Sequence, residues 1–150
     1  MNAIVIATLC VLTLLAIPTR FGTEPVTGGP AFMLFAPQHL LDAARPYAPP
    51  GTHVYTSQVY ASWTEFSAPD LPVMVDSRIE IFPTDVWDDY FTVTNGVDGW
   101  RAVLDRWDVN VVIAHPEQSA ELIPLIQSDP GWREVFHDRE GSVFVRTSPR

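Results

Sequence analysis

Residues 71–82 have the sequence Leu-Pro-Val-Met-Val-Asp-Ser-Arg-Ile-Glu-Ile-Phe. An apolar run ends abruptly here in Asp76, Ser77 and Arg78, which is typical of a buried strand that delivers charged groups to one edge of a sheet. Open α/β sheets keep their ligand sites at the carboxyl ends of such strands. This stretch therefore predicts an α/β fold with polar residues gathered at one sheet edge.

Four other segments have the composition of strands, and stretches with helical spacing separate most of them. These segments are residues 53–57, 109–114, 133–137 and 142–146. The run 109–114 is apolar except for Asn110, and the run 73–76 is apolar up to Asp76, so we expect these two to be adjacent, central, parallel strands. The last two segments flank four turn residues, which predicts a hairpin with Gly141 at positive φ. We therefore expect an α/β three-layer domain with a small, mainly parallel sheet plus a C-terminal β-hairpin.

The composition of the chain excludes several classes of partner. Its 150 residues carry a net charge of −9 at pH 7, and all nine basic side chains are arginine. Such a surface repels phosphate backbones, so no nucleic acid partner is expected, and the sequence has no polybasic patch for anionic lipid heads. A nucleophile elbow, a phosphate loop and a dinucleotide-binding glycine motif are absent from the sequence, and no cofactor is expected. The single cysteine, Cys10, excludes an intrachain disulfide.

The N-terminal segment, residues 3–17, is almost purely apolar and carries no charge. Its length falls short of the roughly 20 residues that cross a bilayer, and it lacks the basic start and small-residue cleavage site of a secretory signal. We expect residues 1–18 to be a membrane helix that begins outside this chain. A cleaved signal and a buried core helix are the alternatives. A linker rich in Pro and Gly follows at 19–36, and a soluble α/β domain occupies 37–150.

Polar side chains follow each predicted strand at the expected carboxyl edge. Ser57 ends the first predicted strand, Asp76 and Arg78 lie at the end of the second, and His115 follows the third. An arginine suits an anionic or hydroxyl-rich ligand, and a histidine transfers protons near neutral pH. These four residues are the candidate ligand-binding site, and no catalytic residue is assigned. A structural ion pair between Asp76 and Arg78 fits the same pattern.

Other chemistry-bearing residues fit structural roles. The four histidines are scattered without the spacing of metal ligands, so no metal site is expected. The pair Asp88-Asp89 falls on a predicted amphipathic helix, which favours a solvated helix face over a pair of catalytic carboxylates. Trp100 and Trp107 recur at helical spacing, which indicates core packing rather than stacking on a sugar.

The order of these features resembles a known family. An apolar helix and a Pro/Gly linker precede a strand, and the motifs then follow in residues 71–82, 87–90, 99–113 and 129–146. This set resembles the soluble C-terminal domain of polytopic bacterial membrane proteins that are similar to integral-membrane glycosyltransferases using polyprenyl-phosphate sugars. The resemblance covers residues 1–147, and family members often have Gly at the position of Ser77.

The resemblance implies a location and a role rather than a reaction. In that superfamily the catalytic acid lies in an early extracytoplasmic loop between membrane helices, a part that this chain lacks, so no catalytic residue is carried over. The resemblance implies a non-catalytic accessory domain, as the C-terminal fragment of a longer protein. Its soluble domain would lie on the extracytoplasmic side of the cytoplasmic membrane. The implied partners are the lipid bilayer, through residues 3–17, and the membrane domain of a glycosyltransferase-like protein.

Two other functions stay open from the sequence. The first is a small membrane-tethered envelope hydrolase or sugar-binding module that uses Asp76, Arg78 and His115. The second is a membrane-tethered interaction domain without a ligand. An in-frame polytopic coding region directly upstream of Met1 would favour the accessory domain over both.

Overall fold

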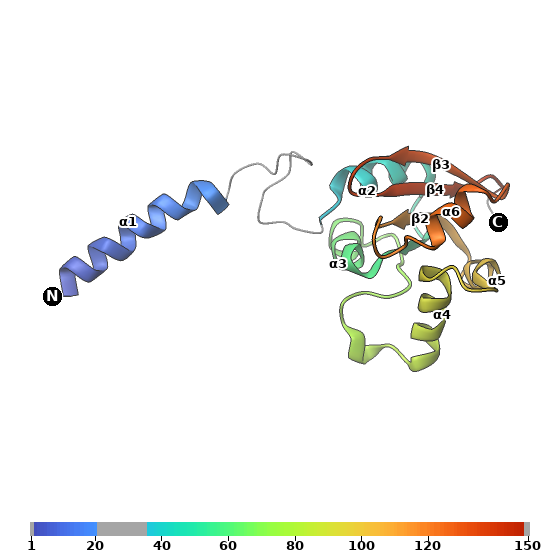
Figure 1. Cartoon of the computed structure of the whole chain (residues 1–150), viewed down its shortest axis with the longest axis horizontal. Helices are drawn as coiled ribbons and strands as arrows, with labels where there is room; N and C mark the ends of the chain where they lie inside the picture. Colours follow the sequence, from blue (N-terminus) through green and yellow to red (C-terminus); the bar gives the residue numbers. More distant parts are fainter. Residues whose placement is uncertain (1, 21–35, 149–150) are drawn as a thin grey trace. The chain divides into compact units, whose positions relative to one another are not determined.

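A mixed four-stranded sheet organises the folded part of the chain (Figure 1). The computed structural model describes residues 2–20 and 36–148. The strands are β1 (His53–Thr56), β2 (Val109–Ala114), β3 (Trp132–His137) and β4 (Ser142–Arg146), in the spatial order β1-β2-β4-β3. β1 and β2 are parallel, whereas β4 is antiparallel to both β2 and β3. The predicted α/β fold and its C-terminal hairpin are confirmed.

Helices cover both faces of this sheet. Side chains along a strand point alternately to the two faces, so apolar residues on both faces need covering. On β2, Val111 and Ile113 belong to the core that includes α2 and α3, whereas Val112 and Ala114 belong to the core that includes α4, α5 and α6. These helices are α2 (Gln38–Ala44), α3 (Gln58–Ser67), α4 (Thr84–Thr94), α5 (Trp100–Arg106) and α6 (Leu122–Gln127). The sheet is therefore the middle layer of the domain.

The strand predicted at residues 73–76 does not form. Val73 makes a single parallel bridge to Val54 on β1, and the chain then leaves the sheet. Because β1 lies between this bridge and β2, the prediction that the run and β2 are adjacent central strands is wrong. Residues 74–76 are buried but pair with no strand, and the bridge at Val73 is an isolated one. The run is a loop packed into the core, and the sheet has one parallel pair of strands instead of being mainly parallel.

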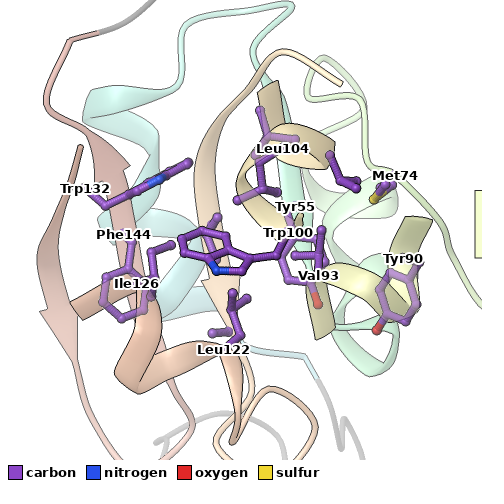
Figure 2. Close-up of a cluster of buried hydrophobic side chains, with 14 of the residues drawn as sticks. Tyr55, Met74, Tyr90, Val93, Trp100, Leu104, Leu122, Ile126, Trp132 and Phe144 are labelled. Atoms are coloured by element: carbon purple, nitrogen blue, oxygen red, sulfur yellow. The ribbon is translucent and has the colours of Figure 1, made fainter. Parts of the chain in front are cut away.

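The larger core lies on the face covered by α4, α5 and α6 (Figure 2). Trp100 lies at its centre and is 4% exposed, which confirms the predicted core packing. Tyr55 of β1 and Phe144 of β4 are fully buried, and the Tyr55 hydroxyl lies 2.8 Å from Thr94 Oγ1. Burying a large apolar side chain contributes about 1.5–3 kcal/mol, so this face holds α4 and α5 onto the sheet.

The hairpin turn differs from the predicted one at Gly141. Its φ is not among the positive values found at the glycines of the described chain. Gly141 is needed for space instead, because a Cβ there would lie closer than 3.0 Å to the carbonyl oxygen of Ala114. Asp138 shapes the turn, since its Oδ1 accepts hydrogen bonds from the backbone amides of Glu140 and Gly141.

The N-terminal unit, residues 1–34, contains the helix α1 (Asn2–Arg20). Every side chain described in it, from residue 3 to residue 14, is exposed, including the free thiol of Cys10. Among the helices of the described segments, none has both the length and the apolar character needed to cross a membrane. The membrane helix expected at residues 1–18 stays a prediction. Most of the linker expected at 19–36 lies outside the described residues.

Candidate functional site

Ser57 and His115 meet at the carboxyl edge of β1 and β2. The backbone amide of His115 donates a hydrogen bond of 2.8 Å to Ser57 Oγ, and Ser119 Oγ lies 2.9 Å from the same oxygen. Ser57 has no exposed surface. Its hydroxyl is therefore enclosed within the fold, where it ties the ends of the two strands to the turn after β2.

The imidazole of His115 is oriented by backbone amides. Its Nδ1 accepts a hydrogen bond of 3.1 Å from the amide of Glu117 and a longer one of 3.3 Å from Gln118. Because Nδ1 accepts, the neutral ring carries its hydrogen on Nε2. Partial burial lowers the pKa of His115 from its ordinary value, and the ring of Tyr60 lies against it with 5.2 Å between centroids. His115 is therefore neutral at pH 7, with Nε2–H as its donor.

Asp76 and Arg78 form the ion pair that the sequence pattern allowed. Asp76 Oδ1 accepts a hydrogen bond of 2.7 Å from the Arg78 amide, and Oδ2 accepts one of 2.9 Å from Arg78 Nε. Arg78 Nη2 contacts Asp76 again and also lies 2.8 Å from Glu65 Oε1 on α3. Asp76 is buried, whereas the Arg78 side chain is 55% exposed. The hydrogen bonds from Arg78 hold the pKa of Asp76 below its usual value.

The four predicted residues form two separate pairs. Within residues 36–148, no hydrogen bond or ion pair joins Asp76 or Arg78 to Ser57 or His115. Asp76 is ionised at neutral pH and is already neutralised by Arg78, so it is not a proton donor there. Ligand binding by this set stays a prediction. The chemistry that remains accessible is the half-exposed guanidinium of Arg78 and the Nε2–H of His115.

Asp89 is not part of a solvated helix face. Its carboxylate accepts a hydrogen bond of 2.8 Å from Trp107 Nε1 and pairs with Arg106. Burial alone would raise the pKa of Asp89, but the donors Arg106 and Trp107 outweigh it, and the pKa lies below its ordinary value. Asp89 therefore joins α4 to the end of α5, and the prediction of a solvated face is wrong for this residue.

A charged cluster at the hairpin turn has no signal in the sequence. His39 Nε2 on α2 lies 2.6 Å from Asp138 Oδ2 and 3.1 Å from Glu140 Oε2. These residues lie far apart in the chain, so no local spacing announces the contact. No group of three or more His, Cys, Asp or Glu side chains in the described segments is placed to hold a metal ion. The cluster is a polar contact that fixes the turn against α2.

The sequence also did not predict a cleft at the opposite edge of the sheet. It has a volume of about 410 Å³, and its walls include Tyr47, Arg133 and Arg146. The sequence placed Arg133 and Arg146 on the two strands of the hairpin but gave no sign that the segment before β1 meets them. Only the tertiary fold brings these residues together.

No protein-family model, curated protein or solved structure matches this chain. The resemblance to the accessory domains of glycosyltransferase-like membrane proteins therefore stays a prediction.

Proposed function

We propose that this chain is a membrane-attached α/β domain that acts as a non-catalytic accessory domain of a glycosyltransferase-like membrane protein. In this proposal α1 holds the domain at the bilayer, on the extracytoplasmic side of the cytoplasmic membrane. The observation that carries the proposal is the exposure of apolar side chains along the whole described part of α1.

The energetics of α1 support attachment. Seven large apolar side chains between Ile4 and Leu14 are more than half exposed. A helix that is apolar all round is normally buried in a membrane or in a protein interior. Leaving seven such side chains in water costs on the order of 10 kcal/mol, which is comparable to the whole stability of a domain. α1 therefore needs an apolar environment, and a bilayer or a neighbouring membrane segment supplies one.

The charge distribution and the strand-end residues support the other parts of the proposal. Residues 18–36 carry Arg20 as their single basic residue, so the positive-inside rule does not favour the cytoplasmic side. Ser57 is enclosed, and Asp76 is engaged by Arg78. A hydrolase that uses these residues fits the geometry less well than a domain without catalysis.

Photo-crosslinking from α1 tests the accessory role. A photoreactive phenylalanine derivative replaces Leu9 of the full chain in native membranes, and a matched variant carries it at Phe66, an exposed position on α3. We expect the Leu9 variant to form adducts with a polytopic glycosyltransferase-like protein and with lipid. Adducts with lipid alone would contradict the accessory role while leaving attachment intact, and the absence of both kinds of adduct would contradict the whole proposal.

A further inference from the structure

The cleft at the starting edge of β1 and β2 has the size and composition of a small-molecule site. Its volume of about 410 Å³ falls within the range of about 300–1,000 Å³ that is usual for ligand pockets. It lies among Thr52 just before β1, Asn110 on β2, Arg133 on β3 and Arg146 at the end of β4. Ser57 and His115 follow the other ends of β1 and β2, so the cleft is separate from the strand-end residues.

The charge of the cleft is opposite to that of the molecule. The chain carries 18 acidic residues against nine arginines, yet the cleft is lined by two arginines and no carboxylate. Five of the arginines between residues 36 and 148 pair with a carboxylate, namely Arg45, Arg78, Arg101, Arg106 and Arg146. Arg133 is exposed and has no such partner in that part of the chain. It is the uncompensated charge of this cleft.

The walls of the cleft are fixed before any ligand arrives. Arg146 donates from Nε to the Val109 carbonyl at 2.6 Å and from Nη2 to Asp105 Oδ1 at 2.6 Å, and its guanidinium lies 4.7 Å from the ring centroid of Trp132. Its side chain is only 11% exposed. Arg146 is therefore held rigidly in the wall of the cleft, and the carboxylate of Asp105 balances its charge. Arg133 is left as the group that can bind an anion.

An aromatic face and two hydroxyl oxygens complete the cleft. The guanidinium of Arg133 lies 5.6 Å from the ring centroid of Tyr47, which is 42% exposed. Thr52 Oγ1 donates its hydrogen to the Pro49 carbonyl at 2.7 Å, and Thr147 Oγ1 donates its hydrogen to the Pro130 carbonyl at 3.2 Å. Since both hydrogens are used inside the fold, these oxygens offer lone pairs to a ligand. A ligand with hydroxyl donors, an apolar ring face and a negative group would match all three features.

We propose that this cleft binds a small acidic sugar, a monosaccharide that carries a carboxylate or a phosphate. Arg133 binds the acidic group with charge-assisted hydrogen bonds. The ring of Tyr47 packs on the apolar face of the sugar, and Thr52 and Thr147 accept hydrogen bonds from its hydroxyls. Binding is non-covalent. All residues that line the cleft lie between Tyr47 and Thr147, so the site does not depend on how α1 is anchored.

Titration of the full chain in detergent micelles, followed by NMR chemical shifts, tests the site. The probes are glucuronate and glucose 1-phosphate, with glucose and inorganic phosphate as partial probes that lack the charge or the ring. We expect saturable shifts at Tyr47, Thr52 and Arg133 with at least one acidic sugar. Each partial probe should bind roughly tenfold more weakly, because it lacks one of the matched groups. A preference between the two acidic sugars identifies the acidic group that Arg133 binds.

Matched variants test whether the acidic sugar binds in the cleft. Arg133→Gln should weaken binding at least roughly tenfold, and Tyr47→Leu should weaken it while keeping the fold intact by its melting curve. Arg139→Gln makes the same charge change at an exposed arginine of the hairpin turn and should leave the affinity unchanged. The proposal is overturned if neither acidic sugar gives saturable shifts up to about 10 mM. It is also overturned if Arg139→Gln weakens binding as much as Arg133→Gln.

Discussion

Replacing Arg78 by Ala should destabilise the folded domain at neutral pH. The substitution removes the donors Nε and Nη2 from the buried carboxylate of Asp76, while the backbone amide of residue 78 stays 2.7 Å away. Hydrogen bonds to a charged group contribute about 1.5–3 kcal/mol. Breaking a fully buried pair would cost about 3–5 kcal/mol, but the Arg78 side chain is 55% exposed and water can take its place. We therefore expect a loss of about 1.5–3 kcal/mol.

The effect should depend on pH, with a sign that follows from the pKa of Asp76. The folded protein holds this pKa below its unfolded value of about 3.9. The pair therefore stabilises the fold above that pH, and its contribution is lost as the pH falls through the lower, folded pKa. The difference in stability between the wild type and Arg78→Ala should be full at pH 7 and should shrink below about pH 4.

Urea unfolding followed by tryptophan fluorescence measures this difference. All five tryptophans lie between residues 63 and 132, so the signal reports the folded domain and not α1. Arg139→Ala is the control, because Arg139 is exposed and itself pairs with no carboxylate in the described part of the chain, so its loss should change stability by less than about 0.5 kcal/mol. If Arg78→Ala unfolds at the wild-type midpoint at pH 7, the pair does not support the fold and the reasoning fails.

Three more predictions follow from the core, the hairpin and the strand-end histidine. Val112→Asp should lower the free energy of unfolding by several kcal/mol, because it buries an unpaired charge on a central strand. Val73→Asp, at the bridge on the edge of the sheet, should still unfold cooperatively when followed by circular dichroism. Equal losses of stability in the two variants would contradict this strand order. Gly141→Ala should cost about 1–3 kcal/mol, because the added Cβ crowds the Ala114 carbonyl, and an unchanged urea midpoint would refute the close approach. An NMR titration of His115 should give a pKa below the usual histidine value of about 6.5. The folded domain should therefore lose stability as the pH falls through that value. A titration midpoint above about 6.5 would contradict the partial burial of His115.

The sequence predicted the strands whose pattern is local. β2 matches the predicted run 109–114, because a run rich in Val and Ile that is flanked by charged and turn residues fits a buried strand. The run 73–76 is also mostly apolar, yet it is a buried loop. Short apolar runs show only that a segment is buried, and the pairing partner decides whether it becomes a strand.

Contacts within one turn could be predicted from the sequence, whereas contacts between distant segments could not. The pair Asp76–Arg78 was predictable, because both residues belong to one turn. Pairs such as Tyr47 with Arg133, or His39 with Asp138, join segments that are far apart in the chain. No local period or spacing reports such contacts, so the acidic-sugar cleft could be found only once the fold was known.

Membrane flotation of the full chain tests the central claim most directly. The wild type, a double variant Leu9→Asp with Leu12→Asp, and Phe66→Asp as a surface control are each mixed with lipid vesicles and centrifuged through a density gradient. We expect the wild type and the Phe66 variant to float with the vesicles. The double variant should stay at the bottom of the gradient, because charged side chains on α1 oppose insertion. A wild-type chain that stays at the bottom, or a double variant that floats equally well, would contradict attachment through α1.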